Sequence, residues 1–247
     1  YWRDWSSDVC SSDLSEPVVI SADHDRSGTG GIEMASEAFV DANAGWIDID
    51  AEEEIRIGEL RTSLDIDIRS RQGIITDDGT DSVNLYADNV YIESHGLGLV
   101  TASDLQGFVD TAINRVEMQG QAGDIRISND RALMVGGITT SDLSDAANVD
   151  GIATSGNVHL IAQGDITVVA SSNGETGLNT SGNSDVLIEA RNGGSIDLSS
   201  SVNTGLGDIG LIADSNILQN AAADITTTGD VLIYAGNAWR MEGDTKV

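Results

Sequence analysis

Hydrophobic and polar residues alternate in short runs along most of this chain, and the clearest runs lie in its C-terminal third. Val158, Leu160 and Ala162 occupy every second position of one run, with His159 and Ile161 between them. A period of two over five residues, bounded by Gly, Asn and Asp, predicts a β-strand. A helix is excluded here because the runs are too short and are interrupted by glycine.

The same run recurs in three later segments. The equivalent positions are Val186, Ile188 and Ala190; Ile209, Leu211 and Ala213; and Val231, Ile233 and Ala235. The repeating units begin at Ile152, Leu178, Val202 and Ile225, in steps of 26, 24 and 23 residues. This spacing predicts an all-β fold, a parallel β-helix (β-solenoid) with coils of about 23–26 residues stacked roughly 4.8 Å apart. An antiparallel sandwich is disfavoured, because it does not need matched positions in every unit.

The pattern continues upstream with looser spacing. Inward positions are predicted at Ile47, Ile49 and Ala51; Leu64, Ile66 and Ile68; Val83, Leu85 and Ala87; and Ile125 and Ile127. Two segments interrupt it. In Leu97–Gln119, an apolar stripe indicates either a helix capped by Ser103 or an irregular, partly extended insertion. The stripe comprises Leu105, Phe108, Val109, Ala112, Ile113 and Val116. The polar segment Ser141–Asp150 is predicted to be a loop.

Composition narrows the functional classes. Asp and Glu number 41 against 12 Lys and Arg, and the net charge is −29. A surface this acidic repels phosphate backbones and anionic lipid, so nucleic-acid partners are excluded. A membrane span is not expected, because no apolar run reaches the roughly 18 residues that a spanning helix needs. The hydrophobic fraction of 40% is too high for a disordered acidic tail.

The first fourteen residues are expected to lie outside the domain. Ser6–Leu14, with the sequence SSDVCSSDL, resembles a translated sequencing adapter, and it contains Cys10, the only cysteine. We therefore expect a single solenoid domain over residues 15–247, without disulfides or a thiol site. Because the last unit stops one strand past its second turn, the chain is expected to be a fragment of a longer protein.

Few motifs in the sequence carry chemistry. Gly205, Gly207 and Gly210 match the spacing of a dinucleotide-binding loop, but a strand follows them instead of the helix that phosphate binding needs. Asp23-His24-Asp25 is interpreted as a solvated loop, since the other histidines lie in different coils. No catalytic residue, cofactor site or metal site is predicted from these motifs.

Acidic side chains share one face of two upstream strands, Asp48 with Asp50 and Asp65 with Asp67. Stacking would bring their carboxylates to about 5 Å, where they repel unless a cation lies between them. Two kinds of cation are candidates for this position. One is a bound calcium ion, which prefers carboxylate oxygens; the other is an arginine side chain, from Arg56, Arg69 or Arg71. A hydrated surface is favoured over a specific calcium site.

The outward positions of the C-terminal strands are unusually apolar for a solvent-exposed row. The candidate binding residues among them are Ile161, Leu187, Ile212, Leu232 and Tyr234. This row is interpreted either as a face that binds a partner, a neighbouring solenoid segment or a glycan, or as a surface covered by another part of the parent chain.

Three stretches carry a resemblance to a known class of proteins: GDIRISNDRALMVGGI, GNVHLIAQGDITVVA and GDIGLIADSNILQ. They resemble coils of large bacterial exoproteins of the filamentous-haemagglutinin and autotransporter-adhesin type. The resemblance covers roughly residues 30–247 and implies a right-handed parallel β-helix on a secreted or cell-surface shaft. It also implies adhesion to host or matrix surface molecules or glycans, without enzymatic activity. The alternative is a carbohydrate-active β-helix, either a polysaccharide lyase or a glycoside hydrolase, which needs acid–base carboxylates or calcium with a basic group. Clustering of Arg126 and Arg131 with aspartates on one coil face would favour this alternative.

Overall fold

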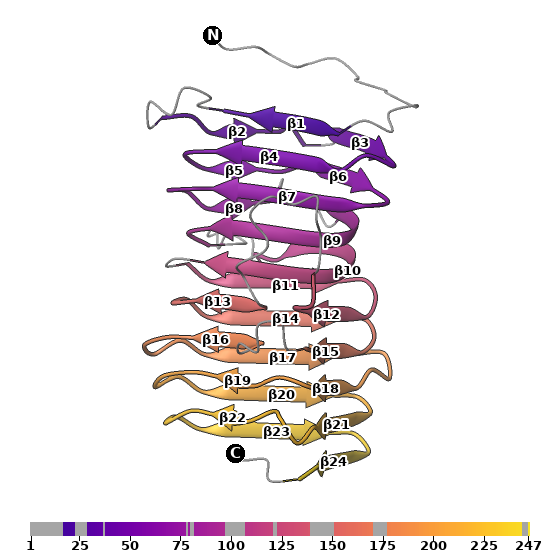
Figure 1. The fold of residues 1–247 in the computed structure, drawn as a ribbon, viewed down its shortest axis with the longest axis vertical. Coiled ribbons are helices and arrows are strands. Elements are labelled where there is room, and N and C mark those ends of the chain that lie inside the picture. The colour runs from indigo at the N-terminus through magenta and orange to yellow at the C-terminus, as the bar shows by residue number, and fades with distance from the viewer. Residues whose placement is uncertain are drawn as a thin grey trace.

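The computed structural model describes residues 17–22, 29–36, 38–77, 79, 82–96, 107–120, 123–138, 151–169, 177–243 and 247. Within these ranges every regular element is a β-strand, and the strands stack as coils along one axis from β1 to β24 (Figure 1). The strands are β1 (Val18–Ser21), β2 (Ile32–Glu33), β3 (Phe39–Asn43), β4 (Ile47–Ala51), β5 (Ile55–Arg56), β6 (Glu59–Thr62), β7 (Asp65–Ser70), β8 (Ile75–Thr76), β9 (Leu85–Ser94), β10 (Val109–Gly120), β11 (Ile125–Asn129), β12 (Leu133–Val135), β13 (Ile152–Thr154), β14 (Val158–Ala162), β15 (Ile166–Val168), β16 (Leu178–Thr180), β17 (Val186–Ala190), β18 (Ile196–Leu198), β19 (Val202–Asn203), β20 (Ile209–Ala213), β21 (Asn216–Gln219), β22 (Ile225–Thr226), β23 (Val231–Ala235) and β24 (Ala238–Met241).

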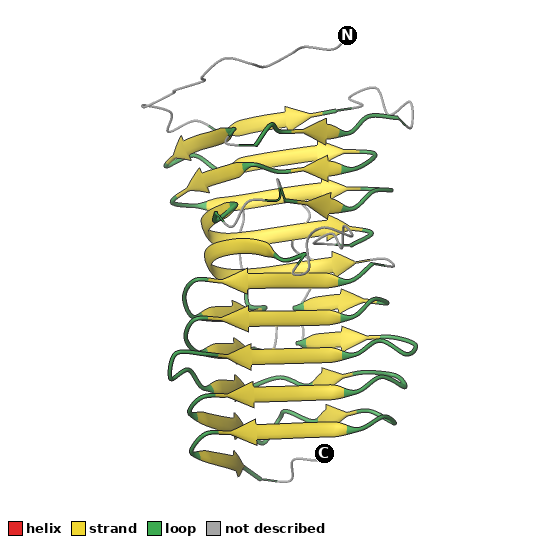
Figure 2. Cartoon of the chain, turned by 180° about the vertical axis from the view of Figure 1, so that it is seen from behind, coloured by secondary structure: helices red, strands yellow, loops and turns green. Residues whose placement is uncertain are grey.

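Each strand pairs in parallel with its equivalent in the next coil, which builds three sheets in the C-terminal half (Figure 2). The first sheet contains β11, β14, β17, β20 and β23. The second contains β12, β15, β18, β21 and β24. The third contains β13, β16, β19 and β22. Strand β10 bonds to β11, β12 and β13, so it crosses all three sides. The predicted parallel β-helix is confirmed.

The pairing register matches the spacing expected in the C-terminal third. Ile152 pairs with Leu178, Leu178 with Val202, and Val202 with Ile225. Other coils depart from 23–26 residues: Thr111 bonds to Asn129, 18 residues on, and Asp124 bonds to Asn157, 33 residues on. The loops absorb these differences, because the strands are held in register by the ladder and not by loop length.

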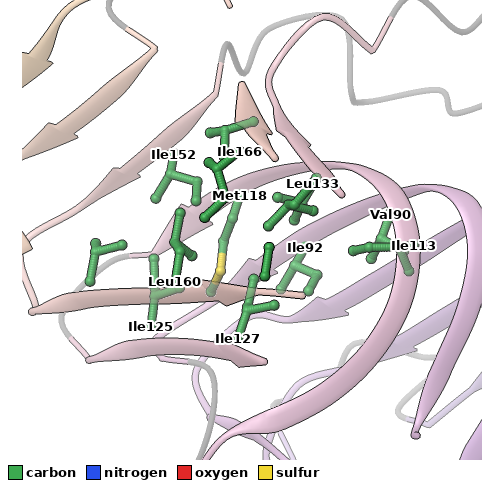
Figure 3. Packing of buried hydrophobic residues seen from close by; sticks show 14 of the residues in the cluster. Val90, Ile92, Ile113, Met118, Ile125, Ile127, Leu133, Ile152, Leu160 and Ile166 are labelled. Atoms are coloured by element: carbon green, nitrogen blue, oxygen red, sulfur yellow. The ribbon is translucent and has the colours of Figure 1, made fainter. Parts of the chain in front are cut away.

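Inward side chains form one continuous apolar core along the stack. Leu211 is fully buried, and in the first sheet it lies between Ile188 and Ile233 of the adjacent coils. Ile125, Ile152 and Ile166 point into the same interior from three strands (Figure 3). Burial of one such side chain stabilises the fold by about 1.5–3 kcal/mol. A single coil has no such core, because its inward row is covered only by neighbouring coils.

The helix considered for Leu97–Gln119 is wrong where the structure describes that segment. Residues 109–120 form β10, a strand of 12 residues; Ser103 and Leu105 lie outside the described residues. Val109, Ile113 and Val116 all point inward, because the strand turns a corner between Ile113 and Val116, where two residues instead of one separate successive inward positions. This extra residue turns the period of two into the three- and four-residue spacings typical of a helix. The polar segment Ser141–Asp150 lies outside the described residues, as does the leader, residues 1–14.

Two inward positions predicted upstream, Val83 and Leu64, are also wrong. Val83 is half-buried and does not belong to the apolar core. Leu64 is 44% exposed, whereas Asp65 in the same run is buried. The cause is the turn that precedes β7, since the Leu64 carbonyl accepts the backbone N–H of Asp88 in the next coil at 2.8 Å. The inward row therefore starts at Ile66, two residues later than the sequence suggests.

Candidate functional site

The outer surface of the first sheet brings the predicted binding residues together. Two columns run along the coils on this surface, which we call the candidate face. One column is His159, Leu187, Gly210 and Leu232; the other is Ile161, Glu189, Ile212 and Tyr234. Outward side chains of a parallel ladder repeat at strand spacing, about 4.8 Å, so neighbours within a column can contact one another.

Exposure is greatest at β23, the last strand of the first sheet, where the inward side chains Val231, Ile233 and Ala235 are also partly exposed. Leu232 and Tyr234 are each 61% exposed, and Leu187 and Ile212 are half-buried. Ile161 is only 6% exposed although it occupies an outward position. It therefore offers little contact surface of its own to a partner.

Polar contacts fix the side chains of the candidate face on β14 and β17. His159 Nε2 lies 2.6 Å from Glu189 Oε1 on the next coil, and Arg191 Nη2 donates to Glu189 Oε2 at 2.9 Å. Burial pushes the pKa of Glu189 up, but the hydrogen bonds from Arg191 and His159 outweigh it and hold that pKa below its ordinary value. The ring of Phe108 meets the His159 ring edge-on, with centroids 4.9 Å apart.

A hollow of about 270 Å³ opens at this end of the face. Its side-chain lining is Arg126, Asn157, His159, Asp185 and Leu187, with Ile125 and Val158 at its base. Arg126, His159 and Leu187 follow one another in a single column, while Asn157 and Asp185 come from the turns that precede β14 and β17. Arg126 also forms an ion pair with Asp124 at 3.2 Å.

A second hollow, of about 210 Å³, lies on β9 and β10 around Tyr86 and Asp88. Asn114 donates to Asp88 at 2.7 Å, and Arg131 lines the opposite side. Each of the two arginines considered for an enzyme site therefore lies with an aspartate, but Arg126 and Arg131 belong to different hollows. The structure does not bring them together on one site.

Arginines separate the stacked aspartates of β4 and β7. Asp48 pairs with Asp67 in the ladder, and Arg69 lies 3.6 Å and 2.9 Å from their carboxylates. Arg71 binds Asp50 at 2.7 Å, and this hydrogen bond raises the pKa of the guanidinium above its ordinary value. The positive charge that the sequence requires here is thus supplied by Arg69 and Arg71. Arg56 binds Glu33 instead.

The remaining motifs do not converge on a site. Gly210 lies inside β20, so the glycine motif continues into a strand as expected. Asp23, His24 and Asp25 lie outside the described residues. In the part of the chain that the structure describes, no group of three or more His, Cys, Asp or Glu side chains is placed to hold a metal ion. The described residues also contain no helix long and apolar enough to cross a membrane.

An Asp/Asn ladder, of which Asn157 and Asp185 line the first hollow, was missed by sequence reasoning. Asp124, Asn157, Asp185, Asp208 and Asp230 form a ladder in which each side chain accepts the backbone N–H of the next member, at 2.8–3.0 Å. The signal is an Asp or Asn directly before each strand of the first sheet. It becomes visible only when the units are aligned in the observed register.

No protein-family model, curated protein or solved structure matches this chain.

Proposed function

We propose that this chain is a non-enzymatic structural and adhesive segment of a secreted or surface-attached bacterial exoprotein. The observation that carries this proposal is the set of apolar side chains on the candidate face, Leu187, Ile212, Leu232 and Tyr234, of which Leu232 and Tyr234 are exposed. Leu187, Ile212 and the pair Leu232 and Tyr234 lie on three successive coils of one sheet and form a contiguous apolar area, which is typical of interaction surfaces. Its partners are host or matrix surface molecules, glycans or neighbouring solenoid segments.

The stacked architecture supports a scaffold role. Every coil of the C-terminal half is hydrogen-bonded to the next on three sides, so residues of the face are held in fixed relative positions before any partner arrives. A preorganised surface loses little conformational entropy on binding. The chain would thus hold a rigid contact surface at a set distance along its axis.

Surface binding tests this proposal. The full chain is immobilised and exposed to matrix proteins and to a panel of oligosaccharides and polysaccharides, with binding read by biolayer interferometry. The double variant Leu232→Ser/Tyr234→Ser should lose at least tenfold in affinity for any partner found. Leu206→Ser is the matched control, because Leu206 is 64% exposed but lies in the turn before β20. Equal losses in both variants, or no binding to any of these surfaces, would contradict the proposal.

The carbohydrate-active alternative rests on the first hollow, where Asp185, His159 and Arg126 supply a carboxylate, an imidazole and a guanidinium. Those groups are of the kinds used in acid–base cleavage of glycosidic bonds. Incubation with polysaccharides distinguishes the two functions: release of reducing ends or of unsaturated sugars would favour the enzyme and overturn the adhesive proposal.

A further inference from the structure

We infer that the hollow lined by Arg126, Asn157, His159, Asp185 and Leu187 is a binding subsite for one unit of an uncharged saccharide. The inference rests on the proposed function and deepens it, because the hollow shares His159 and Leu187 with the candidate face and lies at the β14 end of that face. It assigns a ligand class to a position that the adhesive proposal leaves open.

The polar groups of the hollow are oriented before a ligand arrives. Asn157 Oδ1 accepts the backbone N–H of Asp185 at 2.8 Å, and Asp185 Oδ1 accepts that of Asp208 at 2.8 Å. These bonds use one atom of each side chain. Among the described residues, the Asn157 amide nitrogen and Asp185 Oδ2 have no hydrogen-bond partner, so a donor and an acceptor remain for a ligand.

The other walls are fixed in the same way. His159 is held between Glu189 on the next coil and the ring of Phe108. Arg126 is held by Asp124, and its guanidinium still has further N–H donors. Leu187 supplies an apolar wall; a Cβ added at Gly210 would lie 2.9 Å from its Cδ1, so the Leu187 side chain leans along the sheet over that glycine.

This combination matches the chemistry of a sugar ring. Ring hydroxyls both donate and accept, so they can pair with the Asp185 carboxylate and with the Asn157 amide, while the C–H face of the ring packs on Leu187. Fixed donors and acceptors lower the entropic cost of binding. A hollow of about 270 Å³ is small compared with sites for drug-sized ligands, so it suits a single ring of a longer chain.

Charge selects an uncharged sugar over an acidic one. Arg126 is neutralised by Asp124 and Arg191 by Glu189, whereas Asp185, the carboxylate that lines the hollow, forms no ion pair with another described residue. The whole chain carries a net charge of −29. A uronic acid or sulfated sugar would therefore be repelled both locally and at long range.

The ladder provides variants that change the hollow without removing a backbone contact. Asn157→Asp and Asp185→Asn both keep the Oδ1 atom that accepts the next N–H, but they exchange the donor and the acceptor offered to a ligand. Asp208→Asn is the matched control, because it makes the same exchange at the next rung, outside the hollow.

Binding of defined tetrasaccharides to the full chain tests the inference, measured by saturation-transfer NMR and titration. The uncharged probes are cellotetraose, mannotetraose and xylotetraose; tetragalacturonate is the anionic probe and tetralysine the cationic one. We expect millimolar binding of at least one uncharged probe, a tenfold or greater rise in Kd for Asn157→Asp and Asp185→Asn, and an unchanged Kd for Asp208→Asn.

Three outcomes would overturn the inference: no binding of the uncharged probes, stronger binding of tetragalacturonate or tetralysine, or unchanged affinity in both hollow variants. The result is separable from the adhesive proposal. If Leu232→Ser/Tyr234→Ser loses partner binding and Asn157→Asp keeps it, only the saccharide subsite is rejected. If Asn157→Asp loses binding and Leu232→Ser/Tyr234→Ser keeps it, only the binding role of the exposed residues is rejected.

Discussion

Glu189 Oε1 lies 2.6 Å from Nε2 of His159, which faces it from the preceding coil. The contact joins two coils on the outer surface of the first sheet, where most other neighbours are apolar. Because Arg191 binds the second carboxylate oxygen, Glu189 has charged or polar partners on both sides. The pair thus couples the stability of β14 and β17 to the protonation of one carboxylate.

This coupling predicts a specific acid sensitivity. The folded-state pKa of Glu189 is lower than its ordinary value, so its contribution to stability is present above the unfolded-state pKa and is lost as the pH falls through the folded-state pKa. We expect Glu189→Gln to destabilise the chain at neutral pH by at most about 1 kcal/mol. The difference from the wild type should shrink as the pH falls below the usual carboxyl range. Urea unfolding across that range measures it, with Glu242→Gln, an exposed carboxylate after β24, as control. A difference that stays constant with pH would contradict the prediction.

Adjacent positions of β20 test the inward register. Leu211→Asn places an amide in the core between Ile188 and Ile233, and we expect a loss of at least about 3 kcal/mol in the free energy of unfolding. Ile212→Asn changes an outward, half-buried position and should cost less than about 1 kcal/mol. Equilibrium denaturation of both variants provides the comparison. A larger cost at Ile212 would mean that the strand pairs one residue out of this register.

Replacement of the buried Asn129 side chain is expected to destabilise the fold strongly. Its side chain is fully buried, accepts the backbone N–H of Ile113 at 2.9 Å and donates to the carbonyls of Ile113, Arg131 and Ala132. Asn129→Ala leaves these groups unpaired, so we expect a loss of about 3 kcal/mol or more. The exposed Asn179 in β16 offers the control substitution Asn179→Ala, which should be near neutral. Thermal unfolding that ranks the two variants equally would contradict the role assigned to Asn129.

Stacked carboxylates predict a stabilising substitution. Asp185, Asp208 and Asp230 lie on successive coils, and each of the first two uses one oxygen to accept a backbone N–H. Asp208→Asn keeps the acceptor and removes like-charge repulsion, so stability should rise by about 0.5 kcal/mol at low salt and less at high salt. Asp208→Ala loses the acceptor as well and should cost about 1 kcal/mol. Melting curves at two salt concentrations separate these effects. A gain independent of salt would exclude charge repulsion as its cause.

Strand phase and coil stacking were predictable where each strand crosses one side of the solenoid. Val158, Val186 and Ile209 follow turns of similar composition, so period-two alternation alone places them in one column. The prediction failed at the corners of β10, because an extra residue between Ile113 and Val116 changes the phase without a glycine or proline to mark it.

Side-chain partners across coils were less predictable than the strands. Arg56, Arg69 and Arg71 were named as candidates to separate the aspartates; Arg69 and Arg71 bind aspartates there, whereas Arg56 binds Glu33. The Asp/Asn ladder beside the first hollow was not foreseen. Asp124 and Asn157, for example, lie 33 residues apart and become neighbours only through the coil that joins them. The sequence separation of such contacts varies with the length of the intervening loops, so the local pattern does not show which residues become neighbours.

The inter-coil hydrogen bonds have a consequence for a chain under tension. A folded coil adds about 4.8 Å to the axis, the spacing of neighbouring strands. The coil that separates Val202 from Ile225 would extend to roughly 80 Å if pulled straight. Release of one terminal coil would therefore lengthen the chain many times more than the axis shortens, and the load on the remaining coils would drop at once. A pulled molecule of this architecture would unfold coil by coil from its ends, and each step would dissipate energy while the interior columns stay intact.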